Sequence, residues 1–475
     1  MLNLKLNEII NLLPAELVCG SGDIQITGIT NNSRNVKEGY LFICIKGFKT
    51  DGHKYIADAV KNGAAAVAVT EDAECFGAAV IKVGDARIFM AQASCILYGN
   101  PSHKMKMIGV TGTNGKTTVT TLIKNVLDFT GEKTGLIGTN ETVIGSERLP
   151  AEHTTPESCD LQRILAEMVE KGVKYCVMEV SSHALELHRI DGTRFDIGIF
   201  TNLTHDHLDL HGTMENYLNA KAKLFDMAEI GIINTDDSYA NRLKIKNKIT
   251  YSIDSDSDYK AYDINLSERG VIYKVNNLDV RVLLPGRFSV YNSVAAIAAL
   301  KTLGINDDKI LKGLMVARGA KGRAEIVHIN KPYKVMIDFA HTPDGLYNIL
   351  STVKEFCKGR LITVFGAAGD RDSEKRPEMG EIVGKYADFA IITSDNPASE
   401  NPADIIKQVE SGMKKTSCKY ICIEDRKQAI HYAMDMAHEN DFLLLAGKGH
   451  ETYQIMSDGK HPFSESQIVK EYAER

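Results

Sequence analysis

Residues 109–118 have the types and spacing of a loop that binds phosphate. They read Gly-Val-Thr-Gly-Thr-Asn-Gly-Lys-Thr-Thr, after an apolar run and before a segment with helical periodicity. Small residues in such a turn let backbone N–H groups approach phosphate oxygens, and the N-terminus of the following helix adds partial positive charge. We expect Lys116 to neutralise the β- and γ-phosphates of a nucleotide and Thr117 to bind Mg²⁺. The strict pattern has glycine at position 110, where this chain has valine, so a purely structural turn is the alternative.

Two further groups of polar side chains follow apolar runs. Glu179 lies at the end of residues 175–180, and a carboxylate at the C-terminal edge of a parallel sheet can supply a second Mg²⁺ ligand. Residues 202–211 contain three histidines and two aspartates. Thiolates are absent from this segment, so we expect Mg²⁺ with one imidazole in a shell otherwise made of oxygens. The alternatives are a solvated carboxylate and a polar loop whose histidines cap and hydrogen-bond.

These groups need a sheet whose strands end at a common edge. Apolar runs at 175–180, 195–203 and 231–234 alternate with helical patterns, which predicts a mostly parallel sheet. After a Gly-rich hinge near 318–322, four more short apolar runs alternate with helix-length segments, as in a doubly wound domain. We therefore predict an α/β fold with three domains, a central P-loop ATPase domain with a parallel sheet and a C-terminal Rossmann-like domain. The expected bounds are 1–104, 105–322 and 323–475.

Composition and charge exclude several classes of protein. The 475 residues carry a formal net charge of -6, which argues against a nucleic-acid-binding protein, because phosphate backbones require a basic surface. The N-terminus is mildly amphipathic and is not a secretion signal, and no apolar run is long enough to span a membrane. The nine cysteines include no CxxC pair, so we expect free, mostly buried thiols and a cytoplasmic location.

Taken together, the motifs at 111–118, 179–184, 204–209 and 219–222 resemble the Mur ligase family in order and spacing. The segments 32–36, 154–156, 338–344, 369–372, 395–397 and 447–451 extend the resemblance over nearly the whole chain. Within the family, the chain is most similar to the ligases that add the third residue of the peptidoglycan stem.

The resemblance implies an ATP-dependent acid–amino-acid ligase that acts on UDP-N-acetylmuramoyl-L-alanyl-D-glutamate through an acyl phosphate. The partners are this UDP-linked dipeptide and a free amino acid, and we expect a monomer. The alternatives within this superfamily are the same reaction with meso-diaminopimelate, a ligase for another stem residue and a folylpolyglutamate-type ligase. A rival from another class is a P-loop switch or motor, which would hydrolyse nucleotide without any amino acid.

The resemblance also assigns roles to residues. Catalysis and two Mg²⁺ ions would involve Lys116, Thr117, Glu179, His207 and Lys221, the last as a carbamate formed with CO₂. The residues implied for ATP are Gly112, Thr113, Asn114, Gly115, Lys116, Thr117, Thr118, Asn292, Arg323, Asp338 and His341. Those implied for the UDP-muramyl dipeptide are Ser33, Thr154, Thr155, Ser181 and Arg189. Those implied for the amino acid are Arg371, Asp395, Asn396, Gly447 and Glu451.

Three positions depart from the family pattern. Leu187 stands where glutamine is usual, Lys321 where proline is common, and Ala398 where ligases for meso-diaminopimelate usually have arginine. A guanidinium can hold a distal carboxylate through two parallel bonds, and a methyl group offers none. We therefore expect L-lysine as the added amino acid, with Glu400 and Asp404 suited to its distal ammonium. Lys375 or Lys448 could substitute for the missing arginine, which would restore the alternative.

Overall fold

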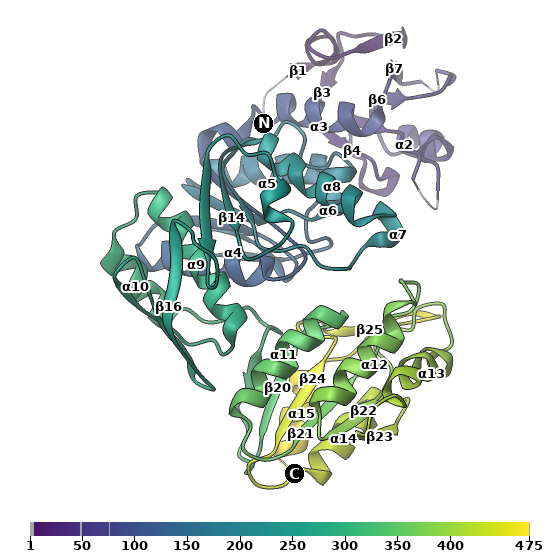
Figure 1. Ribbon diagram of the computed structural model, residues 1–475. Helices are drawn as coiled ribbons and strands as arrows, with labels where there is room; N and C mark the ends of the chain where they lie inside the picture. The colour runs from purple at the N-terminus through teal and green to yellow at the C-terminus, as the bar shows by residue number, and fades with distance from the viewer. Residues whose placement is uncertain (1–3, 48–49, 76, 475) are drawn as a thin grey trace.

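The computed structural model describes residues 4–47, 50–75 and 77–474, and these form three α/β units that follow one another along the chain (Figure 1). In Figure 1 the N-terminal unit lies at the top, the unit with the phosphate loop in the middle, and the C-terminal unit below it. Among the described residues, no helix is long and apolar enough to cross a membrane. The prediction of a three-domain α/β fold is confirmed.

The first unit has a five-stranded sheet in the order β2-β7-β6-β5-β4. Its strands and helices are β1 (Leu4–Lys5), α1 (Leu6–Ile10), β2 (Ala15–Cys19), β3 (Gln25–Ile26), β4 (Gly28–Thr30), β5 (Tyr40–Ile43), α2 (Ile56–Lys61), β6 (Ala64–Val69), β7 (Ala79–Val83) and α3 (Ala86–Leu97). Short 3-10 turns cover Ser33–Asn35, Gly52–Tyr55 and Pro101–Lys104. The apolar side of α3 packs on this sheet through Phe89, Met90 and Leu97.

Two cysteines of this unit correct the expectation of free thiols. Cys19 at the end of β2 pairs with Cys75 in the segment before β7, and their Cα atoms are 6.3 Å apart. The antiparallel pairing of β2 with β7 brings these positions together although 56 residues separate them in the chain. The other seven cysteines are free, and Cys44, Cys95 and Cys176 are among the buried ones.

The second unit contains an eleven-stranded sheet in the order β11-β10-β9-β12-β8-β13-β14-β15-β16-β17-β18. The strands are β8 (Lys106–Thr111), β9 (Thr134–Ile137), β10 (Glu141–Ile144), β11 (Glu147–Pro150), β12 (Tyr175–Glu179), β13 (Phe195–Phe200), β14 (Ala228–Asn234), β15 (Lys248–Ser252), β16 (Tyr259–Ser267), β17 (Gly270–Val275) and β18 (Leu278–Val282). The helices are α4 (Lys116–Phe129), α5 (Ser158–Glu170), α6 (Ser182–Glu186), α7 (Leu208–His211), α8 (Met214–Asp226), α9 (Arg287–Thr302) and α10 (Asp307–Val316), with a 3-10 turn at Ala240–Arg242.

The central strand β8 positions the chemistry. It is paired in parallel with β12 on one side and β13 on the other. Parallel strands end at the same edge, so the loops after β8, β12 and β13 emerge side by side. Helix α4 follows the first of these loops and buries Val119, Leu122, Ile123 and Val126 in the core of the sheet. This anchoring fixes the N-terminus of α4 at the edge where Glu179 and the 202–211 segment also emerge.

The third unit is a six-stranded sheet in the order β19-β20-β24-β21-β22-β23. Its elements are β19 (Glu325–Val327), β20 (Lys334–Asp338), α11 (Pro343–Phe356), β21 (Leu361–Phe365), α12 (Lys375–Tyr386), β22 (Phe389–Ile392), α13 (Pro402–Met413), β23 (Lys419–Cys422), α14 (Arg426–Met436), β24 (Phe442–Ala446), a hairpin of β25 (Tyr453–Met456) with β26 (Gly459–Pro462), and α15 (Glu465–Ala473). Within the six-stranded sheet, all strands except β19 run parallel. The expected Rossmann-like topology is therefore present.

Candidate active site

The phosphate loop after β8 is held in shape by the loop after β13. Gly112 has φ +144, and a Cβ there would lie 1.8 Å from Oγ1 of Thr201. The Thr201 hydroxyl donates to the carbonyl of Asn114 at 2.6 Å, and the N–H of Asn114 donates to Oδ1 of Asn202 at 2.9 Å. Glycine at 112 is therefore required by close approach as well as by backbone conformation.

Lys116 opens helix α4 and turns back over this loop. Its Nζ donates to the carbonyl oxygens of Gly112 and Thr113, both at 2.8 Å. Burial lowers the pKa of Lys116, while the nearby carboxylate of Glu179 opposes that shift. The ammonium therefore lies on the rim of the loop, where the phosphates of a nucleotide would replace these carbonyl contacts.

Glu179 is the centre of a buried group of hard oxygen donors. It is 1% exposed, and it accepts hydrogen bonds from the Thr117 hydroxyl at 2.9 Å and from the N–H of Thr139 at 2.8 Å. The Thr139 hydroxyl adds a third bond at 3.0 Å. A carboxylate and a threonine hydroxyl side by side at the start of a phosphate-loop helix are the ligand types that Mg²⁺ prefers. Thr117 and Glu179 therefore fit the ion that the sequence implies.

Lys221 on α8 is almost completely buried, 1% exposed, and its Nζ donates to the same Gly112 carbonyl at 2.9 Å. The amine lies 4.4 Å from the centre of the Tyr217 ring. Burial, followed by the positive charge of Lys116, lowers its pKa well below the ordinary lysine value. A neutral amine is the form that combines with CO₂, so the environment fits the implied carbamate.

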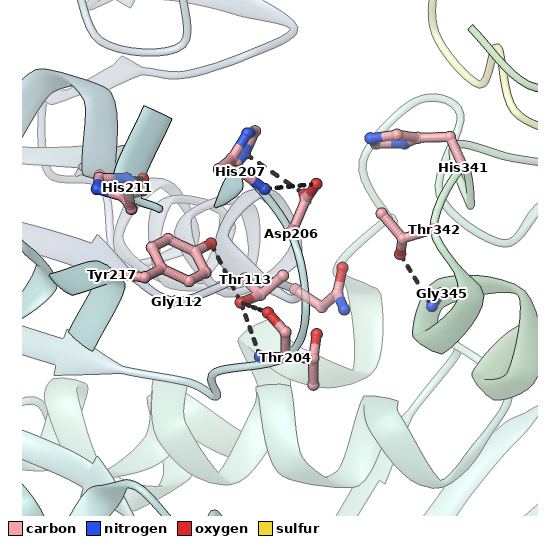
Figure 2. Close-up of polar contacts among 12 residues, drawn as sticks. Gly112, Thr113, Thr204, Asp206, His207, His211, Tyr217, His341, Thr342 and Gly345 are labelled. Carbon is pink, nitrogen blue, oxygen red and sulfur yellow. Dashed lines mark hydrogen bonds and ion pairs between the residues drawn. The ribbon is translucent and has the colours of Figure 1, made fainter. Parts of the chain in front are cut away.

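His207 and Asp206 lie on the rim of the site next to the third unit. Figure 2 shows the Asp206 carboxylate between the imidazoles of His207 and His341. The His207 Nε2 is 3.4 Å from Asp206, and Lys375 of α12 reaches the same carboxylate at 3.6 Å. Burial lowers the pKa of His207, which leaves a neutral imidazole able to act as a ligand.

The remaining histidines of 202–211 have structural contacts. His211 hydrogen-bonds Ser182 at 3.0 Å and stacks on the Tyr217 ring, with centroids 5.0 Å apart. His205 lies 3.5 Å from Asp372 of the third unit. Over the part of the chain that the structure describes, no three His, Cys, Asp or Glu side chains come together as a metal-binding group.

Four of the five residues expected to bind the UDP-muramyl dipeptide lie around Glu179. The Thr155 hydroxyl donates to the Glu179 carbonyl at 2.8 Å, and the N–H of Ser181 donates to Thr155 Oγ1 at 3.1 Å. Thr154 is within hydrogen-bond distance of Thr139, at 3.1 Å. Arg189 donates to the Thr155 carbonyl at 3.1 Å.

Two features extend this group. Arg189 forms an ion pair with Glu157 at 2.7 Å, which the sequence did not single out. Ser33, the fifth residue, lies in the first unit, in the 3-10 turn that follows β4. Its carbonyl accepts a hydrogen bond from the Asn62 side chain at 2.9 Å.

A cavity of about 470 Å³ lies between the second and third units next to the phosphate loop. Of the residues expected to bind ATP, those that line it are Asn114, Gly115, Thr118, Asn292, Arg323, Asp338 and His341. Arg323 lies over the Phe339 ring, with its guanidinium carbon 4.5 Å from the ring centre. The other residues expected to bind ATP do not line this cavity: Gly112, Thr113, Lys116 and Thr117, the last of which lines a second cavity instead.

Asp344 and Asp236 line the same cavity without having been predicted to do so. Asp344 accepts hydrogen bonds from the Asn114 amide at 2.6 Å and from the Thr204 hydroxyl at 3.5 Å, so it joins the third unit to the phosphate loop. Asp344 belongs to the 338–344 motif, so this motif could have identified it as a residue of the site. No local sequence pattern could have predicted the role of Asp236, because the residues that hydrogen-bond to its carboxylate lie 17 to 55 positions away in the chain.

The expected amino-acid residues occupy adjoining loops of the third unit. The Asn396 amide donates to Glu451 at 2.9 Å, and the buried Lys448 ammonium donates to both, at 2.9 Å and 2.8 Å. Gly447 has φ +121, and a Cβ there would lie 2.2 Å from Oδ2 of Asp395.

Arg371 belongs to a neighbouring turn of the same unit. The N–H of Gly369 donates to the Asn396 carbonyl at 2.8 Å, which ties the 369–372 turn to the same place. Arg371 is exposed there, and it has no ion-pair partner within the described ranges.

The carboxylates expected to suit a distal ammonium are already paired. Arg376 is completely buried and holds both oxygens of Glu400 at 2.8 Å. Asp404 is exposed and pairs with Lys407 at 3.0 Å. The expectation for Glu400 is therefore wrong, because Arg376 already neutralises it. Lys375 and Lys448 also have acidic partners, in Asp206 and Glu451.

The fold and this site together define a nucleotide-dependent enzyme with a phosphate loop. Three family descriptions cover most of the chain: the Mur ligase family catalytic domain over 25–97, the Mur ligase middle domain over 110–300, and the Mur ligase glutamate ligase domain over 322–449. The chain belongs to the Mur ligase family and is an ATP-dependent ligase, as the motifs predicted.

Individual relatives match over almost their whole length. The chain is 50% identical over 461 residues to the UDP-N-acetylmuramoyl-L-alanyl-D-glutamate--2,6-diaminopimelate ligase of Caldanaerobacter subterraneus subsp. tengcongensis, with 95% of each chain covered. It is 46% identical over 479 residues to ligase 1 of the same name from Clostridium acetobutylicum, with 99% of each covered.

Solved structures agree on the fold. A solved structure of a UDP-N-acetylmuramoyl-L-alanyl-D-glutamate--2,6-diaminopimelate ligase is similar at 30% identity and a TM-score of 0.69, covering 100% of this chain and 99% of that one. The MurF ligase of Thermotoga maritima, in complex with ADP, has the same fold at 18% identity and a TM-score of 0.64, covering 94% and 97%.

Proposed function

We propose that this ligase joins 2,6-diaminopimelate to UDP-N-acetylmuramoyl-L-alanyl-D-glutamate with cleavage of ATP, a step of peptidoglycan synthesis. The observation that carries the proposal is the identity of 50% and 46% to relatives named for this reaction, over 95% and 99% of the chain. These names favour the alternative over our main expectation of L-lysine. Ala398 offers no guanidinium, so under this proposal another cation of the chain binds the distal carboxylate.

The chemistry must make a carboxylate reactive toward an amine. In the proposed order, a D-glutamate carboxylate oxygen attacks the γ-phosphorus of ATP. The bond between that phosphorus and the bridging oxygen breaks, so that ADP leaves and an acyl phosphate forms. The neutral amine of the amino acid then attacks the acyl carbon, phosphate leaves with its electron pair, and the amine loses a proton. Lys116 offsets charge on the transferring phosphoryl group. Closure of the third unit over the loop would exclude water that otherwise hydrolyses the intermediate.

The proposal includes two Mg²⁺ ions and a carbamate on Lys221. Thr117 and Glu179 would hold one ion, and His207 with the Lys221 carbamate the other. When bound, the ions neutralise phosphate charge. The support is the chemistry of the groups present: hard oxygens around Glu179, a neutral imidazole at His207 and a buried amine whose pKa is lowered.

We propose that Ser33 binds the uridine nucleotide. Thr154, Thr155, Ser181 and Arg189 would bind the muramyl dipeptide, and the loops of Arg371, Asp395, Asn396, Gly447 and Glu451 the amino acid. ATP would occupy the 470 Å³ cavity.

We also propose that the domains span 1–104, 105–322 and 323–475, and that the enzyme works as a monomer in the cytoplasm, where ATP is made.

A phosphate-release assay with the UDP-muramyl dipeptide and a panel of amino acids tests the proposal. We expect kcat/KM for 2,6-diaminopimelate to exceed that for L-lysine, and release to require both the dipeptide and an amino acid. A preference for L-lysine would contradict the acceptor assignment. Phosphate release independent of amino acid would instead favour a nucleotide switch.

A further inference from the structure

Lys448 is a completely buried cation between the two loops proposed to bind the amino acid, 395–398 and 447–451, which are called the acceptor loops below. Its Nζ donates to Oδ1 of Asn396 in the first loop at 2.9 Å and to Oε2 of Glu451 in the second at 2.8 Å. Burying an ammonium group costs free energy unless the group is paired and hydrogen-bonded. The two bonds that offset this cost both go to side chains that the proposed function assigns to the amino acid.

These bonds fix the orientation of both partners. Oδ1 of Asn396 also accepts from the N–H of Ile455 at 3.0 Å, and the Asn396 amide nitrogen donates to Oε2 of Glu451 at 2.9 Å. Oε2 of Glu451 therefore receives two donors from the protein. The other oxygen, Oε1, has no hydrogen-bond donor within the described ranges. One oxygen of this carboxylate is thus held by the chain, and the other can accept from an ammonium group of a ligand.

The position of Glu451 matters because it lines the second cavity, of about 910 Å³. Thr117 and Glu179 line the same cavity, so it reaches from the acceptor loops to the place where the acyl phosphate forms under the proposed function. The orientation of the Glu451 side chain then determines where an amino acid bound to it lies relative to the acyl carbon. Lys448 lines neither cavity, so it would act through Glu451 and without touching the ligand.

The backbone of the acceptor loops is held together by a different cation. Arg426 is almost completely buried and donates to the carbonyls of Ser394 at 3.3 Å and Ala446 at 2.7 Å, the residues directly before the two loops. Its Nε donates to the buried carboxylate of Glu465 at 2.9 Å. Lys448 is therefore not needed to bring the two loops together, and its hydrogen bonds go to side chains alone.

We propose that Lys448 is a positioning residue for the acceptor: its ammonium group holds Glu451 and Asn396 in the orientation in which Glu451 binds an ammonium group of the incoming amino acid. The inference rests on the part of the proposed function that places the amino acid at these loops, and not on which amino acid is added. A carboxylate that is already oriented binds its ligand without first losing side-chain freedom, so the effect of Lys448 lies in the affinity for the acceptor.

A double-mutant cycle of Lys448→Met and Glu451→Gln tests this role. Methionine keeps an unbranched side chain and removes the ammonium group, and glutamine keeps the shape of Glu451 and removes its charge. For the wild type, both single variants and the double variant, kcat and the KM values for ATP and for the acceptor are measured with the other substrates saturating. The acceptor is 2,6-diaminopimelate or L-lysine, whichever the wild type uses with the higher kcat/KM. Thermal unfolding checks that each variant is folded.

Lys385→Met is the matched control. The Lys385 ammonium group also pairs with a carboxylate of the third unit, that of Glu381 at 2.6 Å. Unlike Lys448, however, it is exposed and its partner lines neither cavity. Its kinetic constants should equal those of the wild type.

In Lys448→Met we expect KM for the acceptor to rise about ten-fold, because the charge-assisted bond that orients Glu451 is lost. KM for ATP and the melting temperature should stay close to those of the wild type. In the Glu451→Gln background, the same change should raise KM for the acceptor by only about two-fold or less, since the carboxylate on which Lys448 acts is already gone.

Three results would overturn the positioning role: an unchanged acceptor KM in Lys448→Met, an equal rise in the KM values for acceptor and ATP, or full additivity with Glu451→Gln. If Glu451→Gln alone left the acceptor KM unchanged, the acceptor site of the proposed function would itself be wrong. Should Lys448→Met not fold, Lys448→Gln takes its place in the cycle under the same criteria, because glutamine keeps donor groups in the buried space without the charge.

Discussion

Two lysines donate to one carbonyl oxygen at the centre of the site. Nζ of Lys116 lies 2.8 Å and Nζ of Lys221 2.9 Å from the oxygen of Gly112. Two ammonium groups this close repel each other, and this electrostatic repulsion is removed when one of the two amines is neutral. Lys221 is that amine, because burial and the charge of Lys116 both lower its pKa. This difference suits the proposed roles, in which Lys116 is a cation for phosphate and Lys221 a neutral amine for CO₂.

The first residue-scale prediction concerns Lys116. Lys116→Ala should lower kcat by about 10²-fold or more, because the transferring phosphoryl group loses its positive neighbour. Steady-state ligation at saturating ATP measures the effect, and circular dichroism checks that the fold survives. Lys331→Ala serves as a control that removes a distant exposed charge. Near-normal turnover of Lys116→Ala would show that the assignment is wrong.

The second residue-scale prediction concerns Lys221. Lys221→Arg keeps a positive charge but forms no carbamate, so it should be inactive, while Lys221→Glu should retain part of the activity because a carboxylate can replace the carbamate. Lys223→Arg is the matched control, because Lys223 lies two residues away on the same helix, is only partly buried and pairs with Glu186. Activity assays run with and without bicarbonate, together with intact mass, measure the effect. An unmodified amine in fully active enzyme would exclude the carbamate.

At the scale of elements, Asp236 holds together the loops after β14 and β15. It accepts hydrogen bonds from the backbone N–H groups of Ile253, Asp254 and Ser255 at 2.7 Å, 2.9 Å and 2.7 Å, and from the Tyr291 hydroxyl of α9 at 2.8 Å. Burial raises the pKa of this carboxyl, but the hydrogen bonds outweigh burial and hold it below its usual range. The ionised carboxylate therefore stabilises this wall of the nucleotide cavity.

The expected consequence is a stability loss that depends on pH. Asp236→Ala should lower the free energy of unfolding by about 1–3 kcal/mol at neutral pH, because several N–H groups lose their acceptor. The contribution of a carboxyl whose pKa is depressed on folding is present above about pH 4 and is lost as the pH falls toward the folded-state pKa. Urea unfolding at pH 7 and below pH 4 should show the two proteins converging in acid. A difference that grew in acid would contradict this.

The sequence predicted strand, loop and helix around Lys116 because apolar periodicity and loop glycines are local signals. It predicted the wrong environment for Glu400, because its partner Arg376 lies 24 residues away on α12 and is brought to it by the packing of α12 on α13. Cys19 and Cys75 were missed for the same reason, since the pairing of β2 with β7 joins them. Contacts between distant helices and strands depend on the topology of the fold. Local patterns in one sequence do not show which of these residues meet.

At the scale of the whole molecule, the third unit touches the phosphate loop directly. Asp344 at the start of α11 accepts from Asn114, Lys375 faces Asp206, and Asp372 faces His205. Polar contacts of this kind form and break more readily than an apolar interface, as an enzyme that closes over its substrates requires.

Asp344→Ala should loosen this docking. We expect KM for ATP to rise about ten-fold, because a charge-assisted bond to the loop is lost, with a small increase in radius of gyration. Asp404→Ala is the matched control, since Asp404 occupies the first turn of α13 in the same unit but is exposed and lines neither cavity. Kinetics and small-angle X-ray scattering measure the two effects. Equal behaviour of both variants would place the closing contact elsewhere.

The peptide bond between Lys321 and Gly322 joins one residue that is held by the second unit to another that is held by the third unit. The Lys321 carbonyl is bonded to Asn140 of the second unit, and Gly322 packs on the 449–450 backbone of the third. Any rotation of the third unit relative to the second would then change mainly the few backbone dihedral angles around this bond, which would act as a hinge. Points on a rotation axis move least, so Lys321 would keep its distance to both units throughout the swing.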